Sequence, residues 1–142
     1  AGNPDVVPIP KIKISARAGV TGFEVDDDGQ HLDTYPIERS WVERNGYSQS
    51  RLFAMKVKGH SMEPKLYEGD IIVVNTADTK PVDGDPYVIN FDGEVVVKRM
   101  GRDAGDWWLL SDNPEPQYHR RIVRSKETII IGKVVKRDTT RI

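Results

Sequence analysis

The sequence predicts a mostly β domain that contains one short helix. Most of the chain consists of short runs rich in β-branched and aromatic residues, separated by Gly, Asp, Asn and Pro turn signals. One stretch, residues 38–45, has instead the pattern of a short helix. With 142 residues, the chain is long enough to form one domain with a hydrophobic core.

The first ten residues contain three prolines, at positions 4, 8 and 10. Proline has no backbone N–H donor and resists helix formation, so residues 1–10 are predicted to form an extended linker. A domain that begins on a linker indicates that another domain precedes it in the full protein. The folded domain is expected to cover residues 11–142.

The elements of this domain can be predicted in order along the chain. Ile12 and Ile14 alternate with polar residues, which is typical of a strand. The helix over residues 38–45 is expected to stop at Gly46. An Asp-Gly pair at positions 92–93 lies between two β-rich runs and predicts a hairpin. The further strands are predicted at residues 52–57, 71–74, 87–91, 95–97, 107–110 and 128–135.

Composition narrows the possible function classes. The formal net charge is −1, whereas a chain that gripped the DNA backbone over a broad face would be basic, so this chain alone is predicted to bind nucleic acid poorly. The absence of cysteine excludes a disulfide framework or a thiolate zinc site and favours a reducing, cytoplasmic compartment. Three scattered histidines predict no metal site, and no cofactor is expected. No apolar run is long enough to cross a bilayer, so no membrane association is expected.

Ser61 is the first candidate for chemistry. It lies in the segment Gly59-His60-Ser61-Met62-Glu63-Pro64, where a strand ends and a tight turn begins. A serine on a turn can present its hydroxyl and nearby backbone N–H groups to a bound carbonyl, as acyl transfer requires. The alternative is that Ser61 caps a short helical turn through Glu63.

A nucleophilic serine needs a base, and Lys98 is a better candidate than the neighbouring histidine. In an extended chain the side chains of His60 and Ser61 point to opposite faces. In a strand, Val96, Lys98 and Met100 share one face, so Lys98 would have apolar neighbours. Burial disfavours the ammonium form, which lowers the pKa and makes lysine a proton acceptor. The alternative is an amphipathic lysine that extends its charge into solvent.

These residues, taken together, resemble the LexA-like repressor peptidases, especially phage repressors, which share a Ser-Lys dyad with bacterial signal peptidases. The matching segments cover the chain from about residue 11 to the C-terminus and occur in the family's order. They are residues 59–64, 68–74, 83–85, 94–99 and 111–114. The resemblance implies a compact, largely antiparallel β domain that cleaves its own chain.

The resemblance also implies roles for individual residues. Ser61 would be the nucleophile and Lys98 its general base, and backbone N–H groups around His60 and Ser61 would stabilise the oxyanion. The family cleaves between a small residue and glycine upstream of the serine, which Ala18-Gly19 fits here. The alternative for this pair is a flexible glycine turn after the first strand.

The partners follow from the same resemblance. A helix-turn-helix domain ahead of the linker would bind operator DNA, and the present chain would form a homodimer. A RecA filament or an antirepressor protein would act as the inducing partner. The strand at residues 128–135 is apolar on both faces, so it is either a dimer interface or a central strand of the monomer.

Two other functions remain open at this level. The chain could be a dimerisation module that retains the dyad without using it and is captured by an antirepressor. It could also be a signal-peptidase-like enzyme that cleaves other proteins. The three hypotheses differ in whether the chain breaks its own backbone, breaks a supplied peptide, or breaks neither.

Overall fold

The computed structural model describes residues 5–15, 24–26, 33–124 and 128–139. Nine strands form one sheet, in the order β10-β9-β8-β7-β11-β6-β5-β1-β4, and β2 and β3 form a separate antiparallel pair. In the described residues α1 is the one α-helix, so the predicted mostly β class with one short helix is confirmed. The elements are β1 (Val6–Lys11), β2 (Lys13–Ser15), β3 (Glu24–Asp26), β4 (Asp33–Glu38), α1 (Arg39–Arg44), the 3-10 helix η1 (Gln49–Arg51), β5 (Leu52–Lys56), β6 (Ile71–Asn75), β7 (Pro86–Phe91), β8 (Glu94–Asp103), β9 (Asp106–Leu110), the 3-10 helix η2 (Pro116–Tyr118), β10 (Arg121–Ile122) and β11 (Ile129–Asp138).

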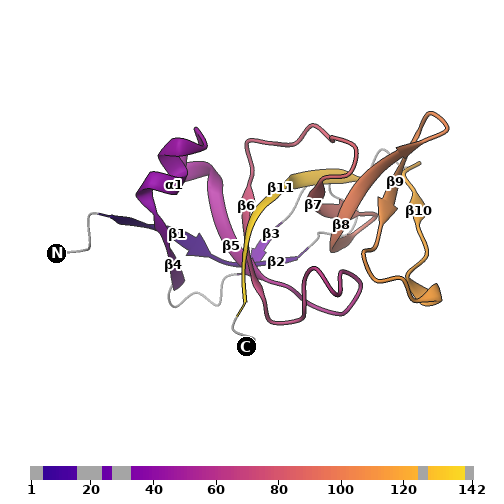
Figure 1. Ribbon diagram of the computed structural model, residues 1–142, viewed down its shortest axis with the longest axis horizontal. Helices are drawn as coiled ribbons and strands as arrows, with labels where there is room; N and C mark the ends of the chain where they lie inside the picture. Colours follow the sequence, from indigo (N-terminus) through magenta and orange to yellow (C-terminus); the bar gives the residue numbers. More distant parts are fainter. Residues whose placement is uncertain (1–4, 16–23, 27–32, 125–127, 140–142) are drawn as a thin grey trace.

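The sheet extends along the whole length of the molecule. Figure 1 shows α1, β1 and β4 at one end of the long axis and β9 and β10 at the other, with β11 crossing the middle. Neighbouring strands are antiparallel except β1 and β5, which run parallel and meet only where Lys11 faces Ala54. Lys98 lies on β8, whereas Ser61 lies in the connection between β5 and β6, which reaches the segment that follows β9.

The helix and the hairpin form at the positions that the sequence predicts. Helix α1 stops at Asn45, and Gly46 follows with a φ of 70°. Between β7 and β8, Asp92 and Gly93 have φ angles of 51° and 94°, which a two-residue turn of this hairpin type requires. The Asn90 side chain accepts a hydrogen bond from the Gly93 N–H at 3.0 Å and closes the turn.

Residues 6–10 belong to the sheet rather than to a linker. They form β1, which pairs with β4 along its whole length, and both Val7 and Ile9 are buried. Pro8 lies opposite Pro36, and neither can donate, so this is a position where backbone groups point away from the partner strand. The Pro8 carbonyl accordingly accepts a hydrogen bond from the Gln49 side chain at 2.7 Å. The prolines therefore fit the strand at the positions that need no donor toward β4.

Strand β4 is one edge of the sheet, and Pro36 lies in its middle. Pro36 faces Pro8 in the non-hydrogen-bonded register, so the Pro36 nitrogen points away from β1 toward the open edge of the sheet. A strand added at this edge would need an N–H donor at that position, and proline has none. An edge without a donor at its centre is a poor template for strand addition. This edge is therefore protected against pairing with another strand.

The C-terminal strand is central in the monomer. β11 pairs with β7 on one side and with β6 on the other, and its register shifts once against each of them. Ile131 and Val134 are buried in the core. Of the two interpretations of residues 128–135, the structure supports the central strand, which explains its apolar character on both faces.

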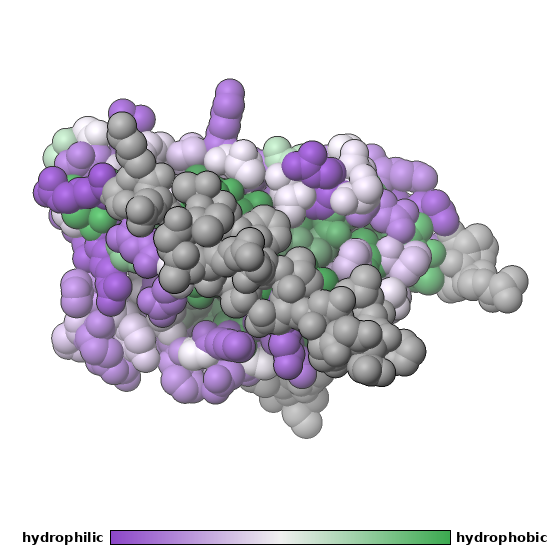
Figure 2. Space-filling model, turned by 180° about the vertical axis from the view of Figure 1, so that it is seen from behind, coloured by the Kyte–Doolittle hydropathy of each residue, from purple (hydrophilic) through white to green (hydrophobic). Residues whose placement is uncertain are grey.

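The two faces of β8 contact different parts of the core. Val95 and Val97 pack against a cluster that includes Phe53, Met62, Leu66, Ile72 and Val88. Val96 and Met100 belong instead to a cluster with Tyr87, Ile89 and Leu109. The predicted alternation is therefore present, and Lys98 shares the face of Val96 and Met100. On the back of the molecule, hydrophobic atoms form a band between hydrophilic margins (Figure 2).

Candidate active site

The serine turn lies in the connection between β5 and β6. Gly59 has a φ of 77°, which favours glycine, and the peptide bond between Glu63 and Pro64 is cis. Met62 is buried in the core and its carbonyl accepts from the N–H groups of Lys65 and Leu66, each at 2.9 Å. Ser61, immediately before this anchor, is half-buried. The turn is therefore held by backbone hydrogen bonds and by the buried Met62 rather than by the Ser61 side chain.

The polar groups of Ser61 are available for chemistry. Among the described residues, the Ser61 hydroxyl has no hydrogen-bond partner, so the alternative that its side chain caps a helical turn is not what the geometry shows. The backbone N–H groups of His60 and Ser61 likewise donate to no other residue in the described part of the chain. A hydroxyl and two N–H groups that no described residue engages form the arrangement that acyl transfer uses.

His60 takes no part in this arrangement. Its side chain is 61% exposed, and its Nδ1 lies 2.5 Å from Glu63 Oε2. Its Nε2 lies 3.9 Å from Glu68 Oε2. The imidazole is therefore turned toward two surface carboxylates, in agreement with the expectation that it does not serve as the base for Ser61.

Lys98 lies on β8 with its amine half-buried in a small cleft. It pairs with Tyr87 of β7, and the β8–β9 register continues to place it opposite Ser111. Its Nζ donates a hydrogen bond to Ser111 Oγ at 2.7 Å. Burial lowers the pKa of Lys98, the positive charge of Arg121 lowers it further, and Glu94 opposes the change. The amine of Lys98 therefore becomes neutral at a lower pH than the amine of an exposed lysine.

The segment Ser111–Asn113 connects the lysine strand to the serine turn. Ser111 accepts from Lys98, and Asp112 forms a two-pronged ion pair with Arg99, at 3.0 and 2.9 Å. The N–H of Asn113 donates to the Ser61 carbonyl at 2.9 Å, and its side-chain amide donates to the His60 carbonyl at 2.8 Å. Two residues of chain span about 7 Å at most. Ser61 and Lys98 are therefore held beside the same short segment.

Residues 111–114 carry part of the family resemblance, but the sequence alone predicts no role for them. The contact of Ser111 with Lys98 depends on the register of the β8–β9 hairpin, which turns at Ala104 and Gly105. Both turn residues have positive φ angles, 53° and 83°, and only Gly105 is a residue that favours such a turn. Counting outward from this turn would have paired Lys98 with Ser111.

The candidate scissile pair, Ala18-Gly19, lies outside the described residues. It belongs to the connection between β2 and β3, whose described residues pair in antiparallel register, with Ile14 opposite Val25. Ile12 and Ile14 pack against the core cluster that contains Val97 of β8. β2 thus lies against β5 and against β8, the strand that carries Lys98.

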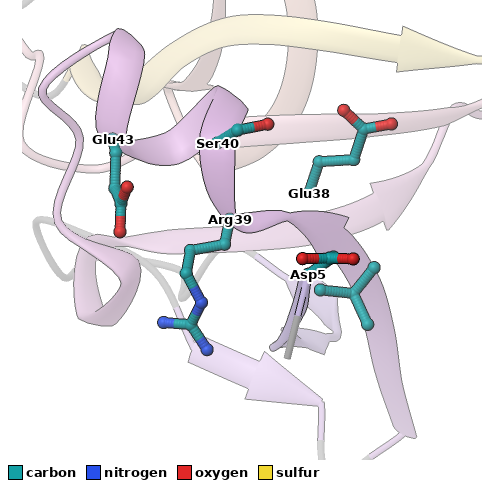
Figure 3. A pocket seen from close by; sticks show the side chains of 6 residues that line it. Asp5, Glu38, Arg39, Ser40 and Glu43 are labelled. Atoms are coloured by element: carbon teal, nitrogen blue, oxygen red, sulfur yellow. The ribbon is translucent and has the colours of Figure 1, made fainter. Parts of the chain in front are cut away.

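Two hollows differ in the chemistry they offer. The cleft beside Lys98 has a volume of about 90 Å³, and Phe91, Val96, Leu109 and Ser111 contribute to its lining. A larger hollow of about 490 Å³ lies near α1 at the other end of the molecule, and its lining includes Asp5, Glu38, Arg39, Ser40 and Glu43 (Figure 3). Among the residues that line this larger hollow there is no lysine or histidine to activate Ser40. The cleft at Lys98 is therefore the better candidate.

The fold is a mostly β domain in which one short segment contacts both Ser61 and Lys98, and comparison with known proteins gives the family. The chain matches the family described as Peptidase S24-like over residues 10–135, and it belongs to that family. It is 29% identical to the HTH-type transcriptional regulator PrtR of Pseudomonas aeruginosa, over 92% of this chain and 52% of that protein. It is 30% identical to the LexA repressor of Mycobacterium leprae, over 92% and 52% of the two chains, and 32% identical to the LexA repressor of Acidothermus cellulolyticus, over 94% and 44%. The chain therefore spans about half the length of these relatives.

None of the helices in the described residues has the length and apolar character needed to span a membrane. In the same part of the chain, no group of three or more His, Cys, Asp or Glu side chains is arranged to hold a metal ion.

Proposed function

We propose that this chain is the C-terminal regulatory domain of a phage-type transcriptional repressor and that it cleaves its own backbone between Ala18 and Gly19. The observation that carries the proposal is the Ser111–Asn113 segment, which contacts Lys98 at one end and Ser61 at the other. The half-buried position of Lys98, which lowers the pKa of its amine, supports the same assignment. Membership of the Peptidase S24-like family agrees with it.

The reaction follows from these groups. Neutral Lys98 takes the proton of the Ser61 hydroxyl as the oxygen attacks the Ala18 carbonyl carbon. The N–H groups of His60 and Ser61 donate to the oxyanion of the tetrahedral intermediate. The C–N bond then breaks, Lys98 returns the proton to the Gly19 nitrogen, and an ester between Ser61 and Ala18 remains. Water, deprotonated by Lys98, hydrolyses this ester and restores the serine hydroxyl.

The function of the whole protein is proposed from its relatives. They are named repressors or helix-turn-helix regulators and are about twice as long as the matched region. A DNA-binding domain ahead of residue 1 would contact operator DNA, and this domain would hold two copies together on a two-fold operator. A RecA filament or an antirepressor protein would act on it to end repression.

Incubation at alkaline pH followed by intact-mass spectrometry tests the proposed reaction. We expect two fragments, residues 1–18 and 19–142, because high pH increases the neutral fraction of Lys98. Ser61→Ala and Lys98→Ala should remain whole, whereas Ser50→Ala and Lys56→Ala, which change exposed residues, should be cleaved like the wild type. Cleavage of Ser61→Ala would end the proposal. A first-order rate that does not depend on protein concentration would separate self-cleavage from cleavage of another copy.

One observation favours a second candidate, a domain that keeps the dyad but does not cleave. The Lys98 amine donates to Ser111, and among the described residues no hydrogen bond joins it to the Ser61 hydroxyl. Such a domain would act by dimerisation and by capture of an antirepressor. An intact chain after prolonged alkaline incubation, together with a dimer in sedimentation, would identify it.

Replacement of Asn113 by alanine is expected to slow cleavage about tenfold, because the amide that fixes the His60 carbonyl is lost. The free energy of unfolding should fall by only about 1 kcal/mol. Asn45→Ala is the matched control, since the Asn45 amide also donates to a carbonyl at 2.8 Å, that of Trp41. The rate and the urea midpoint of both variants measure the difference. Equal cleavage rates for the two variants would contradict the prediction.

A further inference from the structure

Ser111 is the direct hydrogen-bond partner of Lys98. It follows β9 immediately and faces Lys98 across the β8–β9 register, with the amine and the hydroxyl oxygen 2.7 Å apart. Both residues line the small cleft, together with the apolar side chains of Val96 and Leu109. A half-buried lysine amine with one neutral hydroxyl partner is constrained in direction as well as in position.

We infer that Ser111 is a positioning residue of the dyad, whose oxygen accepts one N–H of Lys98 and so directs the lone pair of the neutral amine toward the Ser61 hydroxyl. The inference rests on the proposed self-cleavage. A neutral amine has two N–H donors and a single lone pair, and a general base works only when that lone pair faces the proton it removes. With one N–H fixed on Ser111, the amine can no longer turn its lone pair freely.

The surroundings of Ser111 fix its own position. The next residue, Asp112, is bound to Arg99 by two hydrogen bonds, and Arg99 also donates to the Gly84 carbonyl at 2.7 Å. The following residue, Asn113, is bound to the serine turn through its backbone and its side chain. The Ser111 hydroxyl therefore presents a fixed acceptor, which is the requirement for orienting another group.

The hydrogen bond also has an electrostatic consequence with a definite sign. Of the described residues, the charged or titratable ones that line the cleft with Lys98 are Glu94 from β8, Tyr118 from η2, His119 after it and Arg121 from β10. Among them the Ser111 oxygen is a neutral acceptor. An acceptor favours the ammonium form more than the neutral amine, because hydrogen bonds from charged donors are stronger. Loss of the hydroxyl should therefore lower the pKa of Lys98.

Self-cleavage rates measured across pH for Ser111→Ala and Ser111→Thr test the inference. In Ser111→Ala we expect the plateau rate to fall about tenfold, since the amine is no longer oriented, and the midpoint to move to lower pH. Ser111→Thr keeps a hydroxyl, so its plateau rate and its midpoint pH should both match those of the wild type. Ser50→Ala, at an exposed position, is the control. A loss as complete as that of Ser61→Ala would overturn the inference, because Ser111 would then take part in the covalent step.

A measurement that does not require cleavage completes the test. The Lys98 side chain can be titrated by NMR through its ε-carbon, assigned with Lys98→Arg, in the wild type and in Ser111→Ala. We expect the titration to move to lower pH in Ser111→Ala. An identical titration overturns the inference whether or not the chain cleaves itself. A wild-type chain that never cleaves overturns the proposed function instead, and the titration alone then decides the role of Ser111.

Discussion

Replacement of Gly132 by alanine is expected to lower the free energy of unfolding by about 3 kcal/mol. Gly132 lies on β11, where the register against β7 shifts, and β6 approaches it closely on the other side. A Cβ at this position would lie 2.6 Å from the Asn75 carbonyl oxygen, 2.9 Å from its carbon and 2.8 Å from Val74 Cγ1. These short contacts could be relieved only if β6 and β11 moved apart in the centre of the sheet.

Gly101→Ala is the matched control for this prediction. Gly101 is also a buried strand glycine, and a Cβ there would lie 2.6 Å from Leu110 Cδ1. That contact is with the end of a flexible side chain, which can change rotamer, so we expect a loss below about 1.5 kcal/mol. Urea unfolding of both variants gives the comparison. If the two variants lost equal amounts of unfolding free energy, the prediction would be wrong, because β6 and β11 would then move apart more easily than the backbone contacts indicate.

Local sequence patterns were sufficient to predict most of the sheet. Helix α1, the Asp92–Gly93 hairpin and the alternation along β8 depend on turn residues and on side-chain periodicity within a few residues. The face of Lys98 followed from the same alternation. These features are local, so the sequence carries them without knowledge of the neighbouring strands.

The features that were missed depend on pairing between distant segments. β1 was interpreted as linker because of its prolines, and only the register with β4 shows that Pro8 needs no donor on that side. The role of residues 128–135 was left open because a central strand and a dimer interface have the same apolar pattern, and only the pairing of β11 on both sides distinguishes them. One further contact, that of Ser111 with Lys98, was missed although it depends only on the register of the local β8–β9 hairpin.

The rate of self-cleavage is expected to rise about tenfold per pH unit and to level off at the pKa of Lys98. Only the neutral amine can accept the Ser61 proton, and below the pKa its fraction increases tenfold with each unit. Burial lowers this pKa from the ordinary lysine value, so the plateau should begin at a lower pH than for an exposed lysine. A rate that falls as the pH rises would contradict the assignment of Lys98 as the base.

Two charge changes should move this midpoint in opposite directions. Arg121 disfavours the ammonium form of Lys98, so Arg121→Gln should raise the pKa and slow cleavage at neutral pH. Glu94 stabilises the ammonium form, so Glu94→Gln should lower the pKa and speed cleavage there. Arg44→Gln and Glu43→Gln remove the same charges from exposed positions on α1 and serve as controls.

Salt gives an independent check on the origin of these shifts. Arg121 and Glu94 are both exposed, so their influence on the Lys98 pKa is an interaction through water that salt screens. High salt should therefore bring the midpoints of the two variants toward that of the wild type, whereas the part of the lowering that burial causes should persist. Rate–pH profiles at low and high salt separate the two contributions. If both variants moved the midpoint in the same direction, Lys98 would not be the group that sets the profile.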